Sequence, residues 1–402
     1  MRPQCWVIAL LVAFPVTAWA APLHWVATFT NAQPLIPTPL PSDPPVAGNL
    51  RRGFHDQTVR MVVHTSIGGS ALRLRLTSPF GNPTVLIGAV HVALCRAGSA
   101  IVPGSDRAVM FNGNGQVTVG PGMVIVSDPV SLPLPPQTDV AVSLYLPGDS
   151  GPPSAHDGYH TSYIASGNLT ASPDMKGVVE APVYYWLEGV DVMAPASAGV
   201  IVAFGDSITE GYQSTADADR TWPAMLSKRL AASRRTSQIA VANMGISSNR
   251  LLRNGDGASG LARFDRDVLG QPGARWVVLL LGINDIGGSF MDPVTADEII
   301  GGYHQIIEQA HAHGLKVIGG TLLPYEGAEY FRPAGEKMRE TVNAWIRNSH
   351  AFDAVVDFDA VTRDPVHPAR LRAAYDSGDH LHPNDAGYAA MANAFDLSFF
   401  RH

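Results

Sequence analysis

The sequence of 402 residues contains only two cysteines, Cys5 and Cys95. Cys5 falls in an amino-terminal segment that we expect to be removed, which leaves Cys95 as the only cysteine of the mature chain. An exported protein with one cysteine has no internal disulfide, so its hydrophobic core must stabilise it. A lone cysteine in a strand-like segment is typical of a small, buried hydrophobic residue.

Charged residues are also sparse, at 16% of the chain, and they form no long block of one sign. The formal net charge is -7 and the sequence pI is about 6.0. An acidic balance argues against nucleic acid or an anionic membrane as a partner. The hydrophobic content of 46% is typical of a globular protein with a sizeable core, and the length gives room for two domains.

Long apolar runs are missing except near the start of the chain. Arg2 precedes an apolar segment at residues 6–14, and Ala18 and Ala20 provide small residues around a cleavage point. This pattern predicts a secretory signal peptide over residues 1–20, and an uncleaved anchor is the alternative. We therefore expect a secreted protein, extracellular or periplasmic, with no stable membrane anchor.

Residues 21–195 have the pattern of an all-β domain. Short segments alternate between apolar and polar residues, and clusters of glycine, proline and asparagine separate them. The clearest alternating segments are 58–64, 72–76 and 140–146. This texture predicts a sandwich of the jelly-roll type, without an amphipathic helix. The proline-rich segments 34–45 and 148–157 are predicted to be long loops.

Residues 196–402 alternate between buried strands and helices. The predicted strands are 199–204, 239–242, 276–281, 315–319 and 354–358. Helices are predicted after Thr221, from about Thr295 to Gly314, over 336–348 and from about Asn384. Strands that are each followed by a helix predict a parallel, doubly wound sheet of the α/β class.

Polar motifs follow three of these strands: Gly-Asp-Ser-Ile-Thr around Ser207, then Gly245, then Gly-Ile-Asn-Asp around Asn284. A fourth motif, Asp-His-Leu-His at residues 379–382, precedes the last helix. The carboxyl ends of parallel strands share one edge, so these residues can converge. A serine hydroxyl needs a base to remove its proton, the base needs a carboxylate to orient it, and an oxyanion needs hydrogen-bond donors already in place.

Together the four motifs resemble those of the SGNH/GDSL hydrolases, in the same order and in a matching alternation of strands and helices. The resemblance covers roughly residues 199–402 and implies a flavodoxin-like three-layer fold and ester hydrolysis through an acyl-enzyme. It implies that Ser207 is the nucleophile, that Asp379 and His382 are the acid and base, and that Ser207, Gly245 and Asn284 bind the oxyanion. No Gly-x-Ser-x-Gly elbow surrounds Ser207. The amino-terminal half resembles the β-rich extension of some secreted members.

The 376–383 loop offers rivals for two of these roles. His380 is the alternative base and Asp376 the alternative carboxylate. A metal site made of Asp379, His380 and His382 is a further alternative, but it lacks a clear fourth ligand. We expect no cofactor and no metal.

Other polar and aromatic residues near the motifs receive structural interpretations. Asp206 is expected to hold the turn before the serine, and Asp285 to hydrogen-bond the loop that carries Asn284. Asn249 and Arg250 are candidates to line the pocket. The aromatic segment 184–186 is expected to pack between the domains, with a sugar-stacking platform as the alternative.

These patterns predict a secreted serine carboxylic ester hydrolase. We expect a small-molecule or glycan ester as its substrate, with a short acyl group such as acetyl on a carbohydrate. The alternatives are a glycan-binding protein with a vestigial hydrolase domain, and an acyltransferase that uses the same acyl-enzyme. Nothing in the sequence indicates an oligomeric state.

Overall fold

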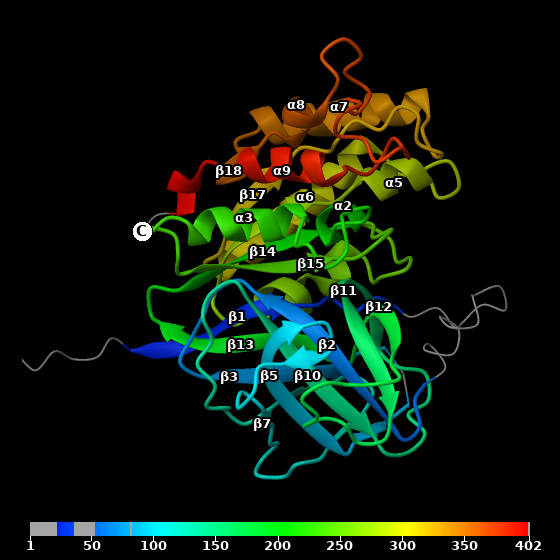
Figure 1. Ribbon diagram of the computed structural model, residues 1–402. Helices are drawn as coiled ribbons and strands as arrows, with labels where there is room; N and C mark the ends of the chain where they lie inside the picture. Colours follow the sequence, from blue (N-terminus) through cyan, green and yellow to red (C-terminus); the bar gives the residue numbers. More distant parts are fainter. Residues whose placement is uncertain (1–21, 36–52, 81–82, 401–402) are drawn as a thin grey trace, which may run out of the picture.

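The computed structural model describes residues 22–35, 53–80 and 83–400 (Figure 1). The predicted signal peptide at residues 1–20 and most of the proline-rich segment 34–45 lie outside the described residues. Within the described ranges, none of the helices has both the length and the apolar character needed to cross a bilayer.

The amino-terminal domain consists of antiparallel β-strands, and its described residues contain no helix (Figure 1). One sheet has the order β1-β13-β3-β9, made of β1 (Leu23–Thr30), β13 (Leu187–Pro195), β3 (Leu72–Ser78) and β9 (Met123–Val126). The other has the order β12-β11-β2-β10-β5-β6, made of β12 (Val179–Tyr185), β11 (Ala155–Ser166), β2 (Gln57–Thr65), β10 (Thr138–Leu146), β5 (Ala89–Ala97) and β6 (Ala100–Ile101), with β7 (Arg107–Ala108) paired to β5. β4 (Val85–Ile87) and β8 (Val117–Val119) form a separate pair. The expected all-β domain is confirmed, and the three alternating segments are β2, β3 and β10.

Alternation along these strands builds the core between the two sheets. Val59, Met61 and Val63 of β2 are fully buried, and Met61 lies opposite Val142 of β10. The prediction of a loop over 148–157 is wrong at its end, because β11 begins at Ala155. The alternating pattern resumes there, one residue after two prolines, which cannot donate to a strand ladder.

The aromatic segment 184–186 packs mostly inside the β domain. Tyr185 and Trp186 are fully buried, and the Tyr185 ring meets Phe54 edge-on with 4.9 Å between the ring centroids. Only Tyr184 lines a cavity between the two domains. The expected packing between domains is therefore limited to one of the three rings.

The carboxyl-terminal domain is built on a parallel sheet with the order β15-β14-β16-β17-β18. Its strands are β14 (Gly199–Gly205), β15 (Ile239–Gly245), β16 (Ala274–Leu280), β17 (Lys316–Gly320) and β18 (Ala354–Val356). Its helices are α2 (Ser207–Glu210), α3 (Trp222–Ala231), α4 (Gly260–Phe264), the π-helix η1 (Asp265–Leu269), α5 (Ile283–Gly288), α6 (Ala296–Ala312), α7 (Pro333–Asn348), α8 (Phe358–Thr362), α9 (Asp385–Asn393) and the 3-10 helix η2 (Leu397–Phe400). The first strand lies second in the sheet, which is the flavodoxin-like order, so the predicted doubly wound fold is confirmed.

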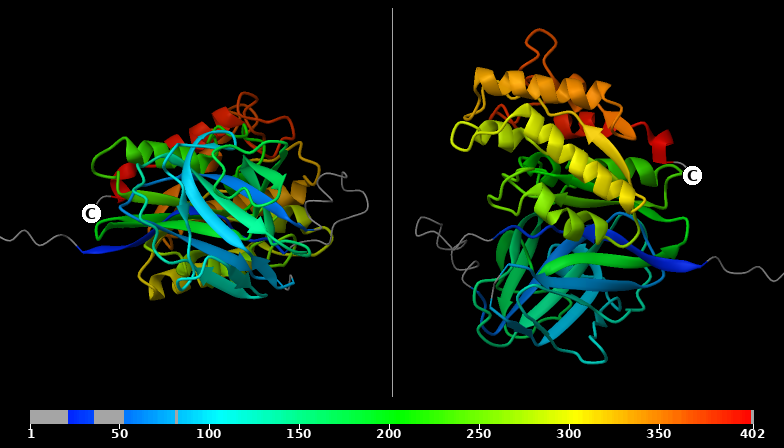
Figure 2. Two further views of the ribbon diagram at one scale, coloured as in Figure 1. Left: turned by 60° about the horizontal axis from the view of Figure 1, so that its bottom comes forward. Right: turned by 180° about the vertical axis from the view of Figure 1, so that it is seen from behind.

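Helices cover both faces of this sheet. α3 and α9 pack on one face, and α4, α6 and α7 lie on the other (Figures 1 and 2). Side-chain caps start several of them: Thr221 caps α3, Thr295 forms a capping box with Glu298 on α6, and Asn384 caps α9. The predicted strand 354–358 is shorter than expected, because the Asp357 side chain accepts a hydrogen bond from the Ala360 amide and begins α8.

The two domains meet along β1, the strand of the β domain that lies against the edge strand β15 (Figure 1). Backbone groups of β15 are bound by hydroxyls of the β domain. The Thr30 hydroxyl donates to the Asn243 carbonyl at 2.9 Å, and the Val241 amide donates to the Ser66 hydroxyl at 3.3 Å. One cluster of buried apolar side chains runs through both domains. The edge strand β15 of the parallel sheet is therefore covered by the β domain.

Candidate active site

Ser207 is the first residue of α2, directly beyond the end of β14. The Asp206 carboxylate caps this short helix by accepting a hydrogen bond from the Ile208 amide at 3.0 Å. A Cβ at Gly205 would lie 2.0 Å from the Thr209 hydroxyl oxygen, so the tight turn requires glycine here. The turn places the serine hydroxyl at the carboxyl edge of the sheet, where ligands bind in folds of this class.

Ser207, His382 and Asp379 come together in one chain of hydrogen bonds. The Ser207 Oγ lies 2.8 Å from His382 Nε2, and His382 Nδ1 lies 2.6 Å from Asp379 Oδ2. Ser207 and His382 are 7% and 8% exposed, so the pair is shielded from bulk water. The ring of Tyr212 meets the His382 ring edge-on, with 4.7 Å between the centroids. This is the geometry that a nucleophile, a base and an orienting acid require.

The Asp379 carboxylate is held ionised by its surroundings. Burial alone would raise its pKa, but hydrogen bonds from the backbone and ring of His382 and from the Leu381 amide outweigh burial and lower the pKa. The carboxylate therefore acts as an acceptor for the His382 Nδ1 proton. That bond fixes the tautomer in which Nε2 faces the serine.

The rival residues form a separate pair. His380 Nδ1 lies 2.6 Å from Asp376 Oδ2, and the His380 side chain is 53% exposed. The backbone of His380 is left-handed, with a φ of 62°, and its ring binds a different carboxylate from the one that His382 binds. Asp376 and His380 thus pair with each other and not with Ser207. The three residues of the alternative metal site, Asp379, His380 and His382, are therefore split between two hydrogen-bonded pairs.

Asn284 lies in the first turn of α5 with a fixed amide orientation. Its Nδ2 donates to the Asn249 carbonyl at 3.1 Å, and its Oδ1 accepts from the Tyr330 hydroxyl at 3.2 Å. The amide is 9% exposed. One N–H of the amide stays free of these contacts, so Asn284 can donate to a developing oxyanion.

The backbone amide of Gly245 already takes part in a hydrogen bond. Its amide donates to the Asn243 side-chain oxygen at 3.0 Å, so the N–H is already used. A Cβ at Gly245 would lie 2.1 Å from the Glu210 amide nitrogen. Glycine is required here because α2 packs directly on β15. The Gly245 amide is hydrogen-bonded to Asn243 in this structure, and its role as an oxyanion donor stays a prediction.

A turn follows Gly245 and offers another backbone donor. The Ile246 amide donates to the Gly205 carbonyl at 3.2 Å, which holds the start of the turn against the end of β14. Ser248 has a left-handed backbone with a φ of 58° and is exposed. Its amide has no hydrogen-bond partner among the described residues. The motif spacing in the sequence does not identify Ser248 as a functional residue. Its left-handed backbone, a conformation that favours glycine, is visible only in the structure.

Arg263 on α4 supports both strand ends and was missed from the sequence. It is 1% exposed and its guanidinium donates to four acceptors at 2.8 to 2.9 Å. The acceptors are the Gly205 carbonyl, the Met244 carbonyl, Asn249 Oδ1 and Asp267 Oδ2. The four-residue spacing of Arg263 and Asp267 on one helical stretch was the only signal in the sequence.

Asp285 and Asn249 brace the same region. The Asp285 carboxylate accepts hydrogen bonds from the Leu251 and Leu252 amides at 2.7 and 3.0 Å. It therefore holds the loop after β15, not the loop that carries Asn284. Asn249 is fully buried and lines no surface, while Arg250 packs over Gly288.

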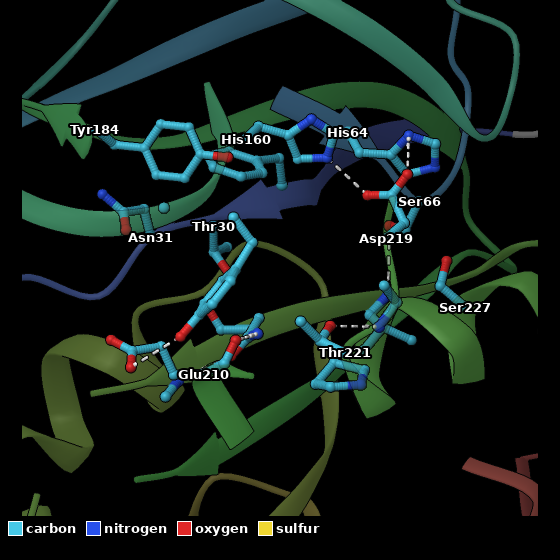
Figure 3. A pocket seen from close by; sticks show the side chains of 18 of the residues that line it. Thr30, Asn31, His64, Ser66, His160, Tyr184, Glu210, Asp219, Thr221 and Ser227 are labelled. Atoms are coloured by element: carbon cyan, nitrogen blue, oxygen red, sulfur yellow. Dashed lines mark hydrogen bonds and ion pairs between the residues drawn. The ribbon is translucent and has the colours of Figure 1, made fainter. Parts of the chain in front are cut away.

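A second polar region lies between the domains, beside a cavity of about 120 Å³ (Figure 3). Asp219 lies between two histidines of the β domain: His160 Nε2 is 2.8 Å from its Oδ1, and His64 Nδ1 is 3.3 Å from its Oδ2. His64, Asp139 and Asp219 are the one group among the described residues whose side chains could hold a metal ion. His64 Nδ1 lies 2.6 Å from Asp139 Oδ1, however, so the two form a direct hydrogen bond. The cluster satisfies its polar atoms as an ion-pair network that links the domains.

A doubly wound parallel sheet with a serine, a histidine and an aspartate joined at its carboxyl edge is typical of serine hydrolases. Residues 203–390 match the model of the GDSL-like lipase/acylhydrolase family. This part of the chain therefore belongs to that family, and the protein is a carboxylic ester hydrolase. A search of curated proteins gave no match.

Solved structures similar to this chain cover about half of it. One is a G-D-S-L family protein described as lipolytic from Desulfitobacterium hafniense DCB-2, at 25% identity and a TM-score of 0.38, covering 48% of this chain and 96% of its own. Another is a GDSL-like lipase from Bacteroides thetaiotaomicron, at 22% identity and a TM-score of 0.38, covering 48% and 84%. A third is a catalytic mutant of an acetylxylan esterase from Geobacillus stearothermophilus, at 25% identity and a TM-score of 0.39, covering 50% and 93%.

Proposed function

We propose that the protein is a secreted esterase that forms an acyl-enzyme on Ser207 and acts on short-chain esters of the acetyl type, including those of carbohydrates. The observation that carries this proposal is the chain of two short hydrogen bonds from Ser207 through His382 to Asp379. A serine hydroxyl becomes an effective nucleophile when a neutral imidazole accepts its proton.

In the first half of the reaction, His382 Nε2 takes the Ser207 proton as Oγ attacks the ester carbonyl. The carbonyl oxygen becomes an oxyanion, which would be bound by the Asn284 amide and by backbone amides of Ser207 and Ser248. His382 then gives its proton to the leaving alcohol as the carbon–oxygen bond breaks. Asp379 stabilises the imidazolium throughout and stays ionised.

In the second half, water replaces the alcohol. His382 removes a proton from water as the water oxygen attacks the acyl carbonyl, and the same donors would bind the second oxyanion. His382 returns that proton to Ser207 Oγ as the acyl bond breaks, which releases the carboxylic acid. Every proton passes through one ring nitrogen, so no metal or cofactor is required by this scheme.

The preference for a short acyl group is supported by the absence of an obvious apolar lid in the sequence. The carbohydrate alcohol is supported by the β-rich companion domain and by the predicted signal peptide. Secretion can be tested by sequencing the amino terminus of the exported protein, which we expect at Ala21. A mature protein that still begins at Met1 would argue for the uncleaved anchor.

Hydrolysis of p-nitrophenyl acetate, butyrate and octanoate by the mature protein and by Ser207→Ala tests the chemistry. We expect activity that falls with chain length and disappears in the variant. Equal activity in both proteins would refute the role of Ser207. Transfer of the acyl group to an added alcohol would identify an acyltransferase, and sugar binding without any turnover would favour the glycan-binding alternative.

A further inference from the structure

A buried hydrogen bond joins the β domain to the helix that carries the candidate nucleophile. His156 Nε2 on β11 lies 2.6 Å from Glu210 Oε1 on α2, and the two side chains are 8% and 4% exposed. His156 Nδ1 lies 2.6 Å from Asn31 Oδ1. The Asn31 Nδ2 donates to the Leu187 carbonyl, which fixes Oδ1 as the atom that faces the ring. Both nitrogens of His156 therefore face oxygen atoms, one from Asn31 and one from Glu210.

The second oxygen of Glu210 faces the turn after β15. It accepts a hydrogen bond from the Ser247 hydroxyl, and the Tyr159 hydroxyl lies 3.4 Å from the same oxygen. Burial alone would raise the pKa of Glu210, but the hydrogen bond and charge of His156 and the hydrogen bonds of Ser247 lower it. The carboxylate is thus ionised and held by residues of both domains.

Ser247 begins the turn that contributes to the proposed oxyanion site. The next residue, Ser248, carries the amide without a partner among the described residues, and the Asn249 carbonyl orients the Asn284 amide. A cavity of about 130 Å³ borders His156, Glu210 and Ser247, so close packing does not hold Ser247 in place. The hydrogen bond to Glu210 therefore holds the Ser247 side chain in place.

We propose that the β domain sets the position of the oxyanion-binding turn through the chain His156–Glu210–Ser247. The three are positioning residues, because none of them touches the reacting atoms. This inference rests on the proposed function and deepens it, since it gives the β domain a role in catalysis. A shift of the turn by about 1 Å can cost on the order of 10²-fold in rate, so loss of one link should slow the acylation step.

The test compares variants of the full-length mature protein on p-nitrophenyl acetate. We expect Ser247→Ala and His156→Gln each to lower kcat by roughly 10- to 100-fold with little change in KM. Ser247→Thr keeps the hydroxyl and should recover most of the lost activity. His55→Gln is the matched control, because His55 pairs with Asp149 on the exposed surface of the same domain and should leave kcat unchanged.

Two further measurements separate positioning from a general loss of structure. Phenylboronic acid forms a tetrahedral adduct with an active serine, so its inhibition constant should rise in parallel with the loss of kcat. The double variant of His156→Gln and Ser247→Ala should lose no more activity than the worse single variant, since both act through Glu210. If His156→Gln does not fold, the comparison of Ser247→Ala with Ser247→Thr still tests whether the Ser247 hydroxyl is needed for kcat.

The proposal would be overturned if Ser247→Ala kept wild-type kcat, or if the two losses multiplied in the double variant. It would also be overturned if Ser247→Thr were as slow as Ser247→Ala. These outcomes are distinct from failure of the proposed function, in which the wild-type protein would show no turnover that depends on Ser207.

Discussion

Arg263 allows a strict test of how the active-site edge is held together. Replacement by methionine keeps an apolar stem but removes all four hydrogen bonds of the guanidinium. Breaking a buried ion pair costs about 3–5 kcal/mol, and each buried acceptor left without a donor costs about 1–3 kcal/mol. Asp267 keeps a second partner, because Arg266 Nε lies 2.5 Å from its Oδ1, so the charge penalty is reduced. We expect Arg263→Met to lower the free energy of unfolding by about 4 kcal/mol.

Arg266→Met is the matched control for this measurement. Arg266 binds the same carboxylate of Asp267, but none of the strand-end acceptors, and it is partly exposed. We expect it to cost about 1 kcal/mol or less. Urea unfolding followed by tryptophan fluorescence gives both values. Equal losses for the two variants would refute the claim that Arg263 holds the ends of β14 and β15.

Three other predictions concern the site itself. Asp379→Asn should lower kcat on the order of 10⁴-fold on p-nitrophenyl acetate, because an amide at this position no longer selects the productive tautomer of His382; a loss below tenfold would count against its role. Asn284→Ala should lower kcat by about 10²–10³-fold with a smaller change in KM, whereas His380→Gln should stay within about twofold; equal rates for these two variants would contradict the assignment. Burial raises the pKa of Asp206 to about 7, well above the ordinary value of an aspartate, so its ionised form destabilises the fold above pH 7 and this cost disappears below about pH 4. Asp206→Asn should therefore be more stable than the wild type at pH 8, by up to about 4 kcal/mol, and equal to it near pH 4 in urea unfolding; a constant difference across this range would disprove the pKa shift.

Much of the fold and part of the site could be predicted because the signals are local. Buried strands appear as continuous apolar runs, and their ends appear as glycine, serine or asparagine. Because a helix follows each strand, the parallel and doubly wound arrangement follows from the need for crossovers. The three-residue spacing of Asp379 and His382 lies within one loop. Their approach to Ser207 follows once all the strands point the same way.

The rest depends on contacts that no local pattern encodes. The motif around Gly245 does not show that β15 continues to Gly245 and that the Asn243 side chain binds its amide. The amide without a partner among the described residues comes three residues later, at Ser248. The sequence around Arg263 is that of an ordinary charged helix residue. Arg263 is buried because the ends of β14 and β15 lie against its helix. The link of His156 to Glu210 joins residues from different domains, so motif spacing within either domain could not reveal it.

The position of β1 explains why the two domains belong together. β15 is the edge strand of the parallel sheet, and an edge strand exposes backbone groups that can pair with other chains. Thr30 and Ser66 satisfy two of those groups with hydroxyls, which hydrogen-bond the edge without extending the sheet by another strand. The Asn243 side chain then donates to the carbonyls of Thr209 and Glu210 at the end of α2. The β domain thus covers the edge strand next to the helix of Ser207, so a change at this interface should alter the active site as well as stability.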